Sequence, residues 1–155
     1  MPDDKAPPPP TLRSKRSLTL RFNIPISKTS RFWDALAEGK FVTTRCGDCG
    51  RLSFPPQADC PNCTSANSKW VDLGTEAELL TYTCVQITPT SFADHDPYVV
   101  AIGRLKEEGV NVLAWVEGAD YTKLKPGATL RIETRKDAEG SPYYVFVAPH
   151  VKKGG

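Results

Sequence analysis

The sequence of 155 residues predicts a mainly β protein, in which a short N-terminal helix and a small metal-stapled ribbon precede a five-stranded barrel. Two Cys-x-x-Cys pairs lie close together in the chain, and runs of strand-like residues follow from about residue 74 onward. The 14 prolines and 11 glycines favour turns and loops over long helices. Turn signals separate the strand-like runs roughly every ten residues, as is typical of small antiparallel barrels.

Residues 1–28 are predicted to form a basic, proline-rich arm. The segment Pro7–Pro10 contains four consecutive prolines, which favour the stiff polyproline II conformation. From Lys5 to Trp33 the chain carries seven basic residues and no acidic residue. Such an arm is either a solvated tail or a segment that docks on a partner, and its composition leaves both possibilities open.

Residues 29–40 are predicted to form a short amphipathic helix. Thr29 or Ser30 is a suitable N-cap, and Gly39 stands where a C′ glycine is expected. Phe32 and Leu36 are separated by four residues and therefore share one face of the helix. We expect this face to cover the rest of the protein or to line a groove.

The ribbon, residues 41–72, contains the pairs Cys46/Cys49 and Cys60/Cys63. Each pair has the spacing of a knuckle that places two sulfurs on one side of a tetrahedral ion, and the ten residues between the pairs suffice for a short hairpin. A thioredoxin-like dithiol would need one pair in a βαβ setting, and structural disulfides are unusual in a reducing compartment. The pattern therefore predicts a structural metal site, with zinc favoured over iron of the rubredoxin type.

Residues 73–150 are predicted to form the barrel, and residues 151–155 a short tail. Five strand-like runs are found, at residues 75–88, 98–105, 110–118, 128–136 and 141–150. Five strands are the number that an OB-fold requires, although the count alone leaves the topology open. The connection at residues 89–97 is long for a hairpin loop, so it is either a binding loop or a plain connection.

The charge is divided along the chain. Residues 1–71 carry 11 basic and 6 acidic side chains, whereas residues 72–149 carry 7 basic and 12 acidic ones. A negatively charged barrel opposes binding to phosphate backbones, which depends on positive charge. Nucleic-acid binding is therefore the least favoured of the functions considered.

The sequence indicates no catalytic residue. The fifth cysteine, Cys84, lies within a strand, and His95 stands between two aspartates in the long connection. Pairing them as a nucleophile and base would need a third group and a geometry that the sequence does not show. The chain also lacks a nucleophile elbow, a phosphate-binding loop and a dinucleotide fingerprint.

The order of these features resembles a known family. The segments "FWDALAEGKF", "RCGDCGRLSFPPQADCPNC", "YTCVQI" and "PYVVAIGRL" are similar to those of the acyl-CoA-associated proteins that join a rubredoxin-like zinc ribbon to an OB-fold, long catalogued as a domain of unknown function. The resemblance covers about residues 30–149. It implies a non-catalytic accessory subunit of a thiolase-type acyl-CoA enzyme, with a thiolase-fold partner and CoA or an acyl-CoA as the expected small molecule.

The resemblance also implies roles for particular residues. The four cysteines would be ligands of a structural Zn²⁺ ion. Contacts with the partner or with acyl-CoA would come from seven residues, namely Phe32, Trp33, Phe54, Pro55, Pro56, His95 and Tyr98. Of these, the helix with Phe32 and Trp33 and the segment of residues 54–56 would lie where the ribbon meets the barrel or the partner. Two features depart from the family pattern: Gln57 stands where an arginine often follows "FPP", and the turn "LKEEG" is one residue longer than usual.

Two other functions remain open, a free-standing acyl-CoA-binding module and a nucleic-acid-binding OB-fold protein. A hetero-complex is expected only for an accessory subunit. The chain shows neither an apolar run long enough to span a bilayer nor the apolar core of a secretory signal, so we expect a cytoplasmic protein.

Overall fold

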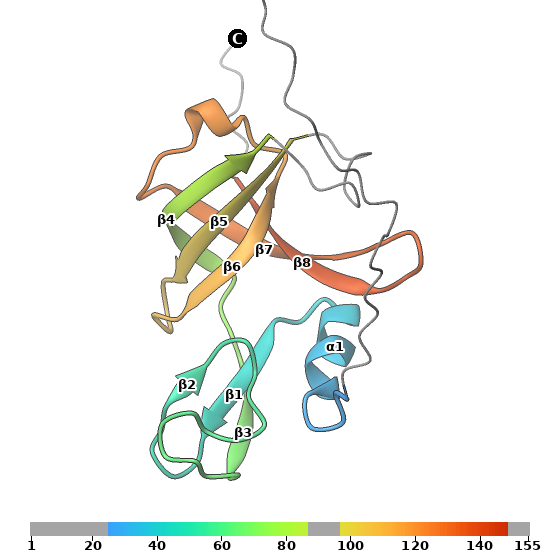
Figure 1. The fold of residues 1–155 in the computed structure, drawn as a ribbon, viewed down its shortest axis with the longest axis vertical. Coiled ribbons are helices and arrows are strands. Elements are labelled where there is room, and N and C mark those ends of the chain that lie inside the picture. Colours follow the sequence, from blue (N-terminus) through green and yellow to red (C-terminus); the bar gives the residue numbers. More distant parts are fainter. Residues whose placement is uncertain (1–24, 87–96, 149–155) are drawn as a thin grey trace, which may run out of the picture.

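The computed structural model describes residues 25–86 and 97–148. Its described elements are α1 (Ser30–Ala37), β1 (Val42–Cys46), β2 (Leu52–Ser53), β3 (Ser68–Asp72), β4 (Glu76–Val85), β5 (Tyr98–Leu105), β6 (Asn111–Glu117), η2 (Tyr121–Lys123), β7 (Thr129–Lys136) and β8 (Pro142–Val147). A small sheet with the order β2-β1-β3 lies below a closed barrel with the order β4-β5-β6-β8-β7 (Figure 1). The predicted mainly β fold is confirmed.

The barrel has the strand order of an OB-fold. Its neighbouring strands are antiparallel except β6 and β8, which pair in parallel through Val116↔Phe146 and Glu117↔Val147. Side chains alternate between the inside and the outside of the barrel, as the burial of every second residue along β6 shows. This alternation follows from the strand period and provides a continuous apolar interior.

Gly103 in β5 is required by the packing of that interior. A Cβ atom at this position would lie 2.7 Å from the ring of Phe146 and 3.1 Å from the Cβ of Ala77. Phe146 is fully buried and fills the space that the glycine leaves. The glycine therefore fits one large aromatic ring into a small barrel.

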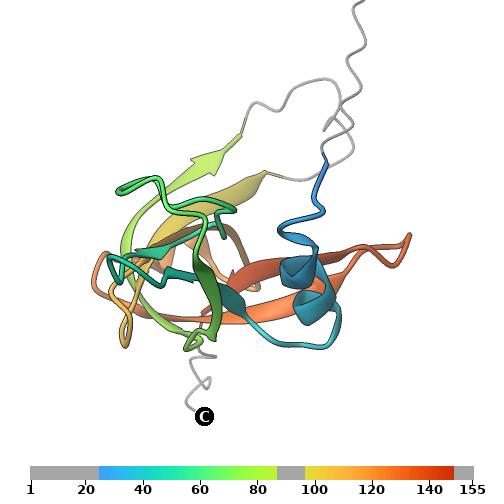
Figure 2. The ribbon, with the colours of Figure 1, turned by 90° about the horizontal axis from the view of Figure 1, so that it is seen from below.

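The helix α1 lies beside β7 and β8, as the view from below shows (Figure 2). Phe32, Ala35 and Leu36 form its buried face. Gly39 has a φ of +81° directly after the C-cap Glu38, in agreement with its predicted C′ role. Thr29 is the N-cap residue, but its side chain caps no helical N–H, because its hydroxyl donates to the Ile26 carbonyl at 3.4 Å.

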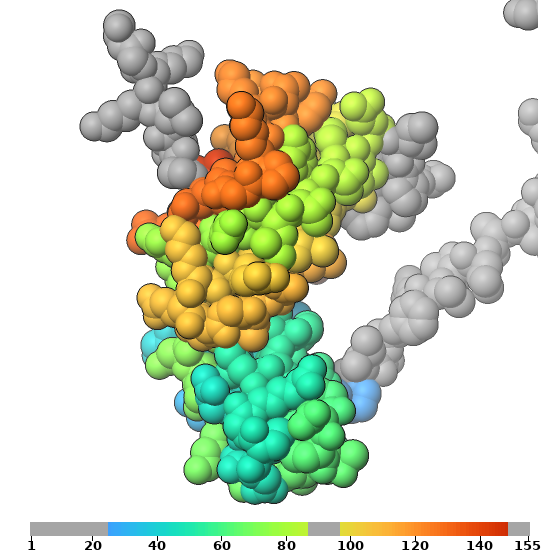
Figure 3. Space-filling model, turned by 90° about the vertical axis from the view of Figure 1, so that its left-hand side faces the viewer, coloured from blue at the N-terminus to red at the C-terminus, as the bar shows by residue number. Residues whose placement is uncertain are grey.

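The ribbon and the barrel meet at a narrow waist. The space-filling view shows the ribbon seated under the turn between β5 and β6 (Figure 3). At the chain crossing, Leu73 N–H donates to the Phe41 carbonyl at 2.9 Å, and Gly74 N–H donates to the Glu108 carboxylate at 2.7 Å. The "LKEEG" turn, which is one residue longer than the family pattern, thus supplies Glu108, whose carboxylate binds the backbone of the linker between β3 and β4.

Candidate metal centre and adjoining surfaces

The two Cys-x-x-Cys knuckles have the same backbone design. In the first, Gly50 N–H donates to the Cys46 carbonyl at 3.1 Å and Cys46 N–H donates to the Arg51 carbonyl at 2.9 Å. In the second, Thr64 N–H donates to the Cys60 carbonyl at 2.9 Å. Cys60 N–H also donates to the Ser65 carbonyl at 2.8 Å, which is the equivalent of the bond from Cys46 to Arg51 in the first knuckle. Identical spacing in the sequence thus produces two turns of identical hydrogen bonding.

The four sulfurs are positioned for metal binding. The Sγ atoms of Cys46 and Cys63 are 3.6 Å apart, those of Cys49 and Cys60 are 3.5 Å apart, and all four lie within 4.8 Å of one another. Sulfurs at about 2.3 Å from a tetrahedral ion are separated by about 3.8 Å, so the observed cluster fits such an ion closely. Cys46 and Cys60 are buried, whereas Cys49 and Cys63 are exposed. One side of the site is therefore covered by protein and the other faces solvent.

The pKa values of the cysteine thiols also favour the binding of a cation. Backbone N–H groups lower the pKa of the Cys46, Cys49 and Cys60 thiols below their ordinary value. The Ser65 N–H likewise lowers the pKa of Cys63, but the neighbouring sulfurs of Cys46 and Cys49 together outweigh it and raise that pKa to about 12. Hydrogen bonds thus favour the ionised form of three thiols and the protonated form of the fourth, and a divalent ion would replace that fourth proton.

Asp48 connects the two knuckles. Its carboxylate accepts hydrogen bonds from the Ser65 hydroxyl at 2.5 Å and from the Asn67 side-chain amide at 2.7 Å, and these bonds lower its pKa. Gly47 is required beside this contact, because a Cβ atom there would lie 2.6 Å from the Asn67 amide. In the knuckle sequence "CGDCG", the second residue therefore allows the Asn67 side chain to come close to the backbone. The carboxylate of the third residue links the first knuckle to the segment that follows the second.

Where β1 begins, at the end of the strand opposite to Cys46, an aromatic cluster joins the three parts of the molecule. Phe32 of α1, Phe41 before β1, Phe54 after β2 and Tyr144 of β8 form this cluster, which we call the aromatic joint. Their ring centroids are 5.2 to 6.4 Å apart. Rings at such distances in tilted or edge-to-face arrangements attract one another beyond simple burial. The joint thus packs the helix and the ribbon against the barrel.

This arrangement places Phe32 and Phe54 where the ribbon meets the barrel, one of the two positions that the resemblance implies. Phe32 is only 4% exposed and Pro56 is buried, so the chain itself covers both side chains. Phe54 is half-buried within the joint. The sequence placed Phe32 on an apolar helix face correctly, but only the tertiary structure shows that the protein itself covers this face.

The other predicted contact residues are more accessible. Trp33 is 40% exposed on α1, with its ring edge against Phe32, and Pro55 is also exposed. Tyr98 is half-buried in β5 and stacks on Trp115 with 4.5 Å between the ring centroids. His95 and most of the connection at residues 89–97 lie outside the described residues.

Gln57 belongs to the ribbon framework. Its backbone N–H donates to the Thr44 hydroxyl at 2.9 Å, and the same hydroxyl lies 3.1 Å from the Gln57 carbonyl. The Gln57 side-chain amide donates to the Pro55 carbonyl at 3.2 Å. Gln57 also lines a hollow of about 390 Å³ at the waist, together with Arg51 of the ribbon and Asn111 of the barrel.

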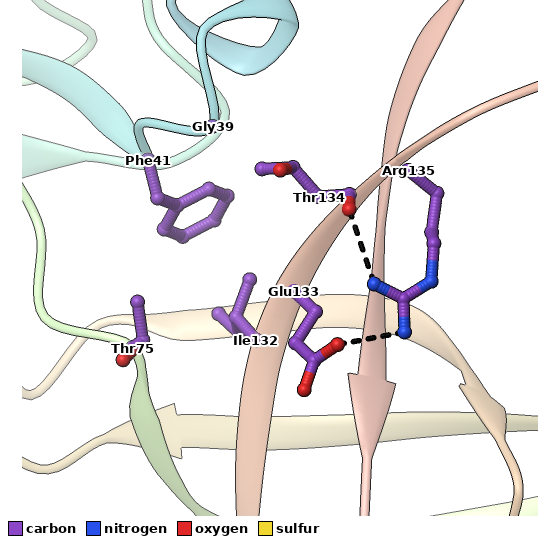
Figure 4. A pocket seen from close by; sticks show the side chains of 7 residues that line it. All are labelled: Gly39, Phe41, Thr75, Ile132, Glu133, Thr134 and Arg135. Carbon is purple, nitrogen blue, oxygen red and sulfur yellow. Dashed lines mark hydrogen bonds and ion pairs between the residues drawn. The ribbon is translucent and has the colours of Figure 1, made fainter.

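A second hollow, of about 270 Å³, lies beside the joint (Figure 4). Phe41 and Ile132 provide its apolar wall, and Arg135 points along its rim. The Arg135 guanidinium donates to the Thr134 carbonyl at 3.2 Å and forms an ion pair with Glu133 at 2.7 Å. Part of its hydrogen-bonding capacity is therefore already used by its own strand.

Sequence reasoning missed two members of the joint, Phe41 and Tyr144. Phe41 ends the segment "FWDALAEGKF" but was given no role there, and Tyr144 stands in the last strand-like run. A weak signal was available, because Tyr143 and Tyr144 are adjacent and must point to opposite sides of β8. Cys84, the other cysteine considered, lies half-buried in β4 opposite Val99.

The fold and the cysteine cluster define a zinc-ribbon protein with an OB-fold barrel. Residues 33–68 match the ChsH2 rubredoxin-like zinc ribbon domain, and residues 70–135 match the ChsH2 C-terminal OB-fold domain. The chain is 31% identical over 113 residues to a DUF35 domain-containing scaffold protein of Pyrococcus furiosus, an alignment that covers 72% of this chain and 82% of the relative. This chain belongs to the DUF35 family.

Solved structures share the fold. A chain of a structure described as an Ltp2-ChsH2(DUF35) aldolase superposes with a TM-score of 0.70 at 23% identity, over 83% of this chain and 98% of that chain. A DUF35 protein of unknown function from Sulfolobus solfataricus superposes with a TM-score of 0.53 at 22% identity, over 68% and 77% of the two chains. In the described part of this chain, no helix has the length and hydropathy needed to cross a bilayer.

Proposed function

We propose that this chain is a non-catalytic accessory subunit of a thiolase-type acyl-CoA enzyme complex. Its zinc ribbon and OB-fold barrel would support assembly of the complex and the access of the acyl-CoA substrate, while a thiolase-fold partner would supply the catalytic groups. The observation that carries this proposal is the continuous match of both domains, in the same order, to a family whose curated relative is described as a scaffold protein. The likeness to a chain of an aldolase complex supports a role beside an enzyme.

The four cysteines are proposed to hold one structural Zn²⁺ ion. A site with four thiolate ligands leaves no coordination position for water or substrate, so the ion would stabilise the ribbon rather than take part in a reaction. The ribbon needs such support, because its strands are short and β2 contains only two residues. The ion would also keep Phe54, which follows β2, in its place in the aromatic joint.

The proposed partner surface includes Trp33 on α1. This side chain is large, 40% exposed and adjacent to the joint, and exposed aromatic residues of this kind often anchor protein interfaces. Pro55 lies exposed on the neighbouring ribbon loop. A partner that contacted both would touch the helix and the ribbon at once.

The first experiment is affinity purification of the tagged full-length chain from its native host, followed by mass spectrometry. A thiolase-fold chain recovered in about equal amount would support the proposal. We expect Trp33→Ala to reduce this recovery at least about tenfold, as alanine substitution of a central interface aromatic commonly does. Unchanged recovery would exclude Trp33 from the interface, and the absence of a thiolase-fold chain would contradict the proposal itself.

Tyr121 provides a matched control. It is 41% exposed, almost the same as Trp33, but it lies in η2 at the opposite end of the molecule from α1 (Figure 1). Tyr121→Ala should therefore leave partner recovery unchanged.

Calorimetric titration of the isolated chain with an acyl-CoA tests the second candidate function, a free-standing acyl-CoA-binding module. That function requires the chain to bind the acyl-CoA without a partner.

A further inference from the structure

The barrel wall opens into a groove between β6 and β8. The two strands pair only near their C-terminal ends, at Val116↔Phe146 and Glu117↔Val147. Before this point, residues 111–114 of β6 pair with β5, and residues 142–145 of β8 pair with β7. Among the described residues, neither stretch has a strand partner on the side that faces the groove. Backbone groups along such edges can accept an additional strand.

The groove is large and mostly apolar. Its volume is about 550 Å³, and its lining comprises Val100, Leu113, Ala114, Trp115, Glu117, Asp137, Tyr143, Tyr144 and Val145. Leu113 is 58% exposed and Tyr143 is 37% exposed, which is unusual for large apolar side chains that lie side by side on one surface. The charged side chains in this lining are both acidic, although Glu117 also lies 3.6 Å from Arg135.

The N-terminal arm carries a segment with matching chemistry. In residues 18–24, "LTLRFNI", four apolar residues alternate strictly with three polar ones. This period of two is typical of a strand with one buried face, and here the apolar face would consist of Leu18, Leu20, Phe22 and Ile24. The arm is also basic, since residues 5–24 contain five Lys or Arg residues and no Asp or Glu. The apolar face of residues 18–24 therefore complements the apolar lining of the groove.

The arm precedes the helix that packs beside one edge of the groove. It joins the described chain at Pro25, and the seven residues from there to Phe32 span at most about 25 Å, given their partly helical path. The Phe32 ring lies 6.1 Å from the ring of Tyr144, which lines the groove. A further seven extended residues cover roughly 23 Å. Residues 18–24 are thus separated by only five residues from α1, which contacts β8 at one edge of the groove.

We propose that residues 18–24 of the arm bind in this groove as an additional strand. The side chains of Leu20 and Phe22 would pack on Leu113 and Trp115, and the strand would form backbone hydrogen bonds with the open edge of β6 or β8. The polar face, with Arg21, would point to solvent. Because OB-folds commonly bind their ligands on the corresponding strands, the arm would cover the usual ligand face of the barrel. This proposal concerns the isolated chain and is independent of the proposed enzyme partner.

Hydrogen–deuterium exchange of the full-length, zinc-loaded chain tests this proposal. We expect amides of residues 18–24 to exchange at least about tenfold more slowly than those of residues 2–6, because a paired strand protects its N–H groups. In the variant Leu20→Asp/Phe22→Asp this protection should be lost, and exchange at residues 111–114 or 142–145 should become faster. Leu113→Asp, a change at an exposed position of the groove, should also release the arm.

The matched control is Thr19→Asp/Asn23→Asp, which adds the same charges to the opposite face of the segment. It should retain most of the protection that Leu20→Asp/Phe22→Asp loses. Unprotected residues 18–24 in the wild-type chain would overturn the proposal, as would protection that survives both Leu20→Asp/Phe22→Asp and Leu113→Asp. Protection that disappears on dilution would show an arm supplied by a second copy, which also overturns binding within one chain.

Discussion

Thr64 shows at the residue scale how the metal centre shapes the backbone. It has a φ of +58°, whereas the equivalent position of the first knuckle is Gly50, with a φ of +72°. A β-branched residue is strained in this left-handed conformation, and glycine is not. The second knuckle thus uses threonine at a position whose geometry favours glycine, and the Thr64 hydroxyl bonds its neighbour's carbonyl, that of Cys63, at 2.7 Å.

We expect Thr64→Gly to stabilise the zinc-loaded protein or leave it unchanged, because relief of the strain, about 1 kcal/mol, opposes the greater entropy of glycine in the unfolded chain. Gly50→Ala should destabilise it by about 1 kcal/mol, because it introduces the same strain. Thermal unfolding of both variants at equal zinc occupancy checks this pair. Equal destabilisation by both changes would contradict the role given to backbone strain.

The element scale is illustrated by β8, whose alternation places two adjacent tyrosines in different environments. Tyr143 is 37% exposed at the groove, whereas Tyr144 lies in the aromatic joint. Burial of Tyr144 raises the pKa of its phenol. Both tyrosines line the proposed arm-binding groove, but only Tyr144 also belongs to the joint.

This pKa shift predicts a pH dependence of stability. Since the pKa of Tyr144 is higher in the folded protein than the value of about 10 in the unfolded chain, its contribution is fully present below pH 10. It is lost as the pH rises through the folded value. Tyr144→Phe, which cannot ionise at this position, should therefore lose less stability than the wild type as the pH rises above about 10. Urea unfolding across this range is the measurement.

Tyr143→Phe is the control for this prediction. It removes a phenol from the adjacent position of the same strand, outside the joint, so its stability should follow the wild-type pH profile. A shallower profile in Tyr143→Phe than in Tyr144→Phe would contradict the assignment of the effect to the joint.

At the scale of the whole molecule, the ribbon and the barrel differ in what stabilises them. The barrel has a closed ring of strands around fully buried residues such as Leu79, Leu105 and Phe146. The ribbon has a three-stranded sheet, the cysteine cluster and its contacts at the joint. Metal loss should therefore affect the two parts unequally.

We expect Cys60→Ser to abolish binding of about one zinc ion per chain and to unfold the ribbon, while most of the barrel stays folded. Metal analysis by mass spectrometry, together with amide exchange in β1–β3 and in β4–β8, checks both parts of this prediction. Cys84→Ser should retain the metal, because Cys84 lies in β4 outside the cluster. Iron in the purified protein, or barrel strands that lose protection together with the ribbon, would contradict this view.

Sequence alone was sufficient where structure depends on neighbours in the chain. The spacing of the four cysteines determined the two knuckles, because a four-residue turn positions both of its sulfurs. The period of two determined the strands, and the predicted runs at residues 98–105 and 128–136 correspond to β5 and β7 within one residue. Long, bounded patterns of this kind leave few alternatives.

Only the tertiary structure decided which surfaces meet. It brought Phe32, Phe41, Phe54 and Tyr144 from four segments into one joint, and so buried the Phe32 side chain where the ribbon meets the barrel. It also paired β6 with β8 over two residues only, which opened the groove beside Leu113. The physical reason is the same in both cases: an alternating pattern shows that a face is apolar, but the element that covers it is determined by strand order and packing of residues far apart in the chain.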